Sequence, residues 1–202
     1  MQYYTDFPAN VKVENGHLLI TAKYENYGGS EYTSGRIKTE GKFSFQYGRV
    51  DIRTKLPGGE GIWPANWMLG DNFSTIGWPA CGEIDIMEYR GASPTIIHGA
   101  IHTPSSYGGT VNTGTTIVPT AETEFHIYSI VWDETTIRFM VDDEEYYVYE
   151  PSEYNADTWP FDAPFFILLN VAVGGSFGGP VNNSIFPQSM EVDYVRVYQH
   201  VE

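Results

Sequence analysis

The chain has 202 residues and a formal net charge of −15, from 26 Asp and Glu against 11 Lys and Arg. A surface this acidic repels nucleic acid, anionic membranes and anionic polymers, so we expect a neutral partner. Hydrophobic residues make up 42% of the chain and charged residues 18%, which is typical of a globular domain. The single cysteine, Cys81, excludes an intramolecular disulfide, and no apolar run reaches the roughly 20 residues of a membrane span.

Apolar residues recur with a period of two along most of the chain, which predicts strands and no helix of three turns. The predicted strands cover residues 17–23, 32–38, 42–53, 63–69, 83–89, 96–102, 125–132, 136–141, 146–149, 165–173 and 190–198. In the third of these the apolar phase changes at Gly48, which predicts a bulge within one strand. The run 165–173 is almost continuously apolar, as in a strand covered on both faces. The sequence therefore predicts one all-β domain over residues 1–202, built from two stacked antiparallel sheets.

Three carboxylates fall within six residues of one predicted strand, at Glu83, Asp85 and Glu88. Strict alternation places Glu83 and Asp85 on one face and Glu88 on the other, but one extra residue in a β-bulge would return Glu88 to their face. Long side chains leaning together can then reach the roughly 5–5.5 Å separation of retaining glycosidases, and their repulsion raises the pKa of one member. A solvated sheet face that bears three acids is the alternative interpretation.

Two indoles, Trp63 and Trp67, lie four residues apart and therefore on one face of a predicted strand. The apolar faces of sugar rings stack on such rings, while the indole N–H stays available as a donor. Core packing is the favoured interpretation of any single tryptophan. Two tryptophans on one face, beside an acidic strand, favour instead an aromatic surface on which sugar rings stack. His102 is interpreted either as a hydrogen-bonding group of this site or as a structural histidine.

The segment from Trp78 to Tyr89, WPACGEIDIMEY, resembles the catalytic signature of glycoside hydrolase family 16. The extra methionine, Met87, makes this segment similar to that of the laminarinase branch of the family. Members of that branch cleave internal bonds of β-1,3-glucans. Further similar segments are SGRI at 34–37, YGRV at 47–50, GIWPANWML at 61–69, FHIY at 125–128, LNVAVGG at 169–175 and VDYVRVY at 192–198.

The resemblance implies a concanavalin-like jelly-roll sandwich with an open groove across its concave sheet. It implies that Glu83 is the nucleophile, that Glu88 is the acid/base, and that Asp85 tunes the pair. Trp63 and Trp67 resemble groove aromatics, and the sugar-contacting polar positions that it implies are Arg36, His102 and Asn170. The expected activity is retaining endo-hydrolysis of β-1,3-glucosidic bonds in laminarin-type β-glucan, with mixed-linkage 1,3-1,4-glucan as a side activity and no cofactor for catalysis.

The resemblance also implies a structural calcium ion, held by the Gly16 carbonyl, the Asp193 carboxylate and an N-terminal backbone oxygen. The usual N-terminal strand and loop of the family do not align with this chain, which predicts weakened calcium binding, lower stability or edge-mediated association of an otherwise monomeric protein. We expect an extracellular, secreted protein, although the chain carries no signal peptide. The alternative functions are a non-catalytic β-glucan-binding module and a structural sandwich.

Overall fold

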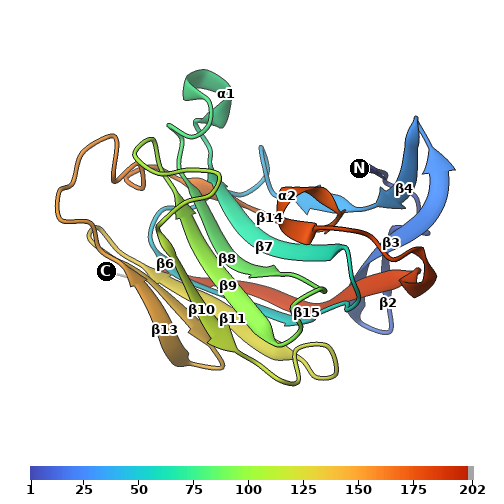
Figure 1. Cartoon of the computed structure of the whole chain (residues 1–202). Coiled ribbons are helices and arrows are strands. Elements are labelled where there is room, and N and C mark those ends of the chain that lie inside the picture. Colours follow the sequence, from blue (N-terminus) through green and yellow to red (C-terminus); the bar gives the residue numbers. More distant parts are fainter. Residues whose placement is uncertain (200–202) are drawn as a thin grey trace.

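The computed structural model describes residues 1–199, and almost all of its regular structure is two sheets of strands, one over the other (Figure 1). The nine-stranded sheet has the order β1-β4-β3-β15-β6-β11-β12-β13, with β2 beside β3. Its strands are β1 (Gln2–Tyr4), β2 (Val11–Glu14), β3 (His17–Tyr27), β4 (Ser30–Ser34), β6 (Gly48–Lys55), β11 (His126–Trp132), β12 (Ile137–Val141), β13 (Glu144–Tyr149) and β15 (Gln188–Tyr198).

The second sheet is six-stranded, with the order β10-β9-β8-β7-β14-β5. Its strands are β5 (Arg36–Lys38), β7 (Ile62–Gly70), β8 (Glu83–Tyr89), β9 (Ile96–His102), β10 (Thr113–Ile117) and β14 (Phe165–Val173). The helical elements are the four-residue helices α1 (Phe73–Ile76) and α2 (Gly175–Gly178) and the 3-10 turn η1 (Asn183–Ile185). Within residues 1–199 there is thus no helix of three turns, as predicted, and none that is long and apolar enough to cross a membrane.

The prediction of an all-β sandwich is confirmed, with one departure from antiparallel pairing. Strand β1 runs parallel to β4, with Gln2 opposite Tyr32. The amide of Val173, on the other sheet, donates to Oε1 of Gln2 at 2.8 Å. The N-terminal strand therefore ties the edge of one sheet to β14 of the other.

The predicted strand over residues 32–38 is two strands, because the chain passes from one sheet to the other at Gly35. Strand β4 ends at Ser34 in the nine-stranded sheet, and β5 begins at Arg36 and pairs with β14. A Cβ on Gly35 would lie 2.3 Å from Cγ2 of Val11, so only glycine fits this crossing. Alternation of side chains continues through such a crossing, which is why the pattern resembled one strand.

The predicted bulge at Gly48 is also wrong, because the chain changes sheets there. Phe45 forms an isolated bridge with Phe165 of the six-stranded sheet, whereas β6 begins at Gly48 in the other. The turn uses positive φ values of 62° at Tyr47 and 124° at Gly48. A phase change in an apolar pattern thus marked a crossing between layers.

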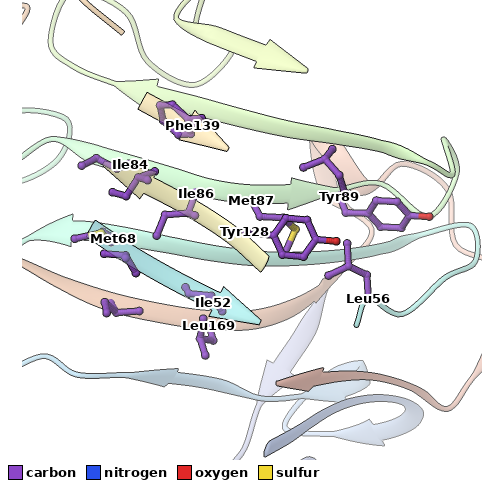
Figure 2. Packing of buried hydrophobic residues seen from close by; sticks show 14 of the residues in the cluster. Ile52, Leu56, Met68, Ile84, Ile86, Met87, Tyr89, Tyr128, Phe139 and Leu169 are labelled. Carbon is purple, nitrogen blue, oxygen red and sulfur yellow. The ribbon is translucent and has the colours of Figure 1, made fainter. Parts of the chain in front are cut away.

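The core fills the space between the sheets, and β14 explains its own nearly continuous apolar run. Ile167 and Leu169 belong to the large cluster between the sheets, part of which Figure 2 shows around Leu169, Met68 and Tyr128. Phe166 and Leu168 pack on the opposite face of the same strand, in a smaller cluster with Leu69 and the fully buried Cys81. Strand β14 is therefore apolar on both faces, as predicted, although it lies next to the edge strand β5.

We expect Gly48→Ala to lower the free energy of unfolding by about 1–3 kcal/mol, because a Cβ there would lie 2.2 Å from the Tyr198 carbonyl oxygen at a φ reserved for glycine. Gly109→Ala is the matched control, since its Cβ would meet no atom within 4 Å and it should stay within about 0.5 kcal/mol. Urea unfolding measures both, and equal stability of the two variants would contradict the close approach of Gly48 to the Tyr198 carbonyl.

Candidate active site

The acidic strand β8 contains the predicted bulge. Asp85 pairs with Ala100 of β9 and Glu88 pairs with His98, so two residues of β8 oppose the single Gly99. Those two residues, Ile86 and Met87, both point into the core between the sheets (Figure 2) and are at most 1% exposed. Glu88 therefore returns to the face that already carries Glu83 and Asp85.

This face of the six-stranded sheet is hollowed into adjoining clefts. A cleft of about 290 Å³ and one of about 400 Å³ share Trp63, Glu83 and Glu88 in their walls, and a third of about 450 Å³ shares Glu83 with them. All eight residues predicted for the catalytic and sugar-contacting site line these clefts: Arg36, Trp63, Trp67, Glu83, Asp85, Glu88, His102 and Asn170. The clefts form one groove across β9, β8, β7, β14 and β5.

The two indoles are held by hydrogen bonds to different partners. Nε1 of Trp63 donates to Oε1 of Glu88 at 2.9 Å, and Nε1 of Trp67 donates to Oδ1 of the buried Asn170 at 2.9 Å. The guanidinium of Arg36 lies 5.3 Å from the ring centre of Trp67. Each ring is thus oriented from one edge, and the Trp63 bond links the aromatic surface directly to a carboxylate.

His102 lies beside the other two carboxylates. Its Nε2 atom is 2.9 Å from Oδ2 of Asp85 and 3.9 Å from Oε1 of Glu83. Asp85 is 4% exposed and His102 8%, so the three groups interact in a poorly solvated floor of the groove.

The surroundings shift the pKa of each carboxylate upwards. Burial, and then the charge of Asp85, raise the pKa of Glu83 to about 8. Burial raises the pKa of Glu88 to about 7, although the hydrogen bond from Trp63 opposes the shift. Burial, and then the charge of Glu88, hold the pKa of Asp85 well above its usual range. The cluster therefore retains protons near neutral pH, as an acid catalyst must.

Two groove aromatics, Trp78 and Phe177, were not predicted as site residues from the sequence. Trp78 is 41% exposed and meets Tyr107 edge-on, with ring centres 5.3 Å apart. Phe177 of α2 packs against Trp63 at 5.2 Å and against His98 at 5.1 Å. Trp78 and Tyr107 lie in irregular segments and Phe177 in the four-residue helix α2, each beside a glycine, and such short segments carry no alternation signal. An aromatic residue beside glycines was the available clue.

The predicted calcium ligands lie away from the groove, in the nine-stranded sheet. Gly16 occupies the turn between β2 and β3, and Asp193 is the extra residue where β15 shifts register against β6. The carboxylate of Asp193 accepts from Arg53 at 2.5 Å and lies 4.0 Å from Nε2 of His17. Calcium prefers 6–8 oxygen ligands, so the Asp193 carboxylate and the Gly16 carbonyl would supply only part of its coordination shell.

A family model described as glycosyl hydrolases family 16 matches residues 2–196. The chain belongs to this family. A beta-glucanase of Rhodothermus marinus is 47% identical over 216 residues, which cover 100% of the chain and 75% of that protein. Glucan endo-1,3-beta-glucosidase A1 of Niallia circulans is 39% identical over 98% of the chain and only 32% of its own length.

The fold of this chain is similar to that of solved family 16 structures. The crystal structure of a laminarinase from Flavobacterium sp. UMI-01 superposes with a TM-score of 0.93 at 49% identity, covering 98% of the chain and 84% of that protein. The jelly-roll architecture that the sequence resemblance implied is therefore confirmed.

We expect Trp63→Phe to raise the pKa of Glu88. The change removes an N–H hydrogen bond that stabilises the ionised carboxylate. Trp67→Phe is the matched control in this family 16 domain, since its indole donates to an amide oxygen. A ¹³C NMR titration of the Glu88 carboxyl carbon measures both shifts. The same shift in both variants, or none in either, would contradict the role of the Trp63 bond.

Proposed function

We propose that residues 1–202 form a single catalytic domain that cleaves internal β-1,3-glucosidic bonds of laminarin-type β-glucan with retention of anomeric configuration. The observation that carries this proposal is the row of Glu83, Asp85 and Glu88 on one face of a groove. In that groove Glu88 is bonded to the indole of Trp63. Two carboxylates beside an aromatic surface are the groups that retaining glycosidases require.

The proposed mechanism has two steps. Glu88 gives its proton to the glycosidic oxygen while the Glu83 carboxylate attacks the anomeric carbon, so that the C–O bond to the leaving sugar breaks and a glycosyl ester forms. Glu88, now ionised, removes a proton from water, which attacks the same carbon and releases Glu83. Asp85 lies between them and raises the pKa of Glu83. No cofactor takes part in either step.

The groove supports a neutral polysaccharide as the substrate. It continues past the carboxylates on both sides, with Arg36, Trp67 and Asn170 in one cleft and His102 and Phe177 in another, so a chain can be bound at an internal bond. The net charge of −15 disfavours sulfated polymers, nucleic acid and anionic membranes. The named activities of the Rhodothermus and Niallia relatives agree with a β-glucan, and we propose mixed-linkage 1,3-1,4-glucan as a secondary substrate.

We propose in addition that the protein acts outside the cell and as a monomer. The polymeric substrate favours action outside the cell, because a long glucan is too large to be taken up before it is cleaved. Association through the outer edges of β1 or β13 is the alternative oligomeric form. Calcium at Gly16 and Asp193 stays a prediction.

We expect Glu83→Ala and Glu88→Ala each to reduce laminarin hydrolysis at least a thousandfold, with azide separating their roles. Azide with dinitrophenyl laminaribioside should give the α-glycosyl azide from Glu83→Ala, where it replaces the nucleophile. It should give the β-azide from Glu88→Ala, where it opens the glycosyl ester. Product NMR distinguishes the two.

The exposed Glu144→Gln serves as the control and should remain fully active. Near-normal hydrolysis by either alanine variant would refute the assignment. Laminarin binding without product by the unmodified protein would instead support the glucan-binding module.

We expect kcat/KM to peak near neutral pH and not at pH 4–5, because the reactive form carries Glu83 ionised and Glu88 protonated while both pKa values are raised. Because the pKa of Glu83, about 8, lies above that of Glu88, about 7, activity rises through the lower value and falls through the higher one. Asp85→Asn removes a charge that raises the pKa of Glu83, so the alkaline limb should move to lower pH. Profiles from pH 4 to 9 test this, and an unmoved alkaline limb would contradict it.

A further inference from the structure

Three potential metal ligands converge on the floor of the groove. Glu83, Asp85 and His102 each offer one atom, and the three atoms all lie within 4.8 Å of one another. Nε2 of His102 is 2.9 Å from Oδ2 of Asp85 and 3.9 Å from Oε1 of Glu83. A tetrahedral zinc ion with ligands at roughly 2.0–2.1 Å needs ligand separations of about 3.3 Å, which these two distances bracket.

An independent observation also points to a cation. Oδ2 of Asp85 has no hydrogen-bond partner within residues 1–199, although the residue is only 4% exposed. Nε2 of His102 lies 2.9 Å from this oxygen without hydrogen-bond geometry, so the two form an ion pair only when the imidazole is protonated. A buried carboxylate oxygen without a partner is costly, and a metal ion bound between these groups would remove that cost.

We propose that Glu83, Asp85 and His102 bind a divalent transition-metal ion of the Zn²⁺ type, and that this ion reversibly inhibits the enzyme. One imidazole and two carboxylates suit zinc, copper or nickel better than calcium or magnesium, which prefer oxygen ligands alone. The inhibition rests on the proposed function, because the ion would occupy the oxygens of Glu83 that attack the sugar. The fourth ligand position would face the groove, where substrate and metal compete.

The ion should exchange freely. Metal-bound histidines usually donate their second nitrogen to a partner, and losing that partner weakens binding 10–100-fold. Nδ1 of His102 is buried and has no such partner in the described part of the chain. The site is therefore an inhibitory one and not a structural zinc centre.

Calorimetry of Zn²⁺ added to the metal-free protein tests the proposal without measuring catalysis. We expect one ion per chain in this site, at least tenfold weaker binding in His102→Gln, and no competition from Mg²⁺. His17→Gln is the matched control, because His17 lies 3.8 Å from Glu191 and 4.0 Å from Asp193 in the other sheet; it should leave groove binding unchanged. Circular dichroism verifies that both variants are folded.

Location and inhibition are then measured separately. Anomalous diffraction from a zinc-soaked crystal should place the ion between the three side chains, and Zn²⁺ should inhibit laminarin hydrolysis competitively. Cys81→Ser should leave the inhibition unchanged, because Cys81 is fully buried. Equal Zn²⁺ affinity in His102→Gln, an ion elsewhere, or inhibition lost in Cys81→Ser would overturn the proposal. Zinc binding in the absence of any hydrolysis would refute the proposed function alone.

Discussion

The site depends on one extra residue in β8. Ile86 and Met87 both enter the core, and this doubling turns Glu88 onto the face of Glu83 and Asp85. The apolar environment of the pair fixes the bulge, since moving either side chain to the groove would expose a large hydrophobic group and empty part of the core. Packing between the sheets thus determines the position of a carboxylate on the far side of one of them.

The same sheet supplies the electrostatic environment. Its groove face keeps Asp85 and His102 almost out of contact with solvent, so charges placed there interact strongly and proton affinity rises. Trp63 opposes this rise in proton affinity through its hydrogen bond to Oε1 of Glu88. A row of ionised carboxylates would be unfavourable for folding, and the raised pKa values keep part of the row protonated near neutral pH.

The sequence predicted the position of the acidic row better than the connections between the strands. The acidic row and the bulge were visible because three carboxylates interrupted an apolar strand in the wrong parity, which few structural explanations accommodate. The crossing at Gly35 was not visible, because alternation continues while the partner strands change. At Gly48 the phase change was visible, but a bulge and a crossing between sheets both produce one. Trp78 and Phe177 were missed for a related reason: an irregular segment and a four-residue helix are too short to show periodicity, and only tertiary contacts bring these residues to the groove.

The pairing of β1 with β4 has a practical consequence. Met1, Gln2 and Tyr4 form part of the wall of the cleft that contains Glu83 and Glu88, and the sulfur of Met1 lies against Gly174. A strand at the edge of the nine-stranded sheet thus supplies part of the wall of a groove that lies on the other sheet. A change in β1 would therefore reshape the groove without altering the strand that carries the carboxylates.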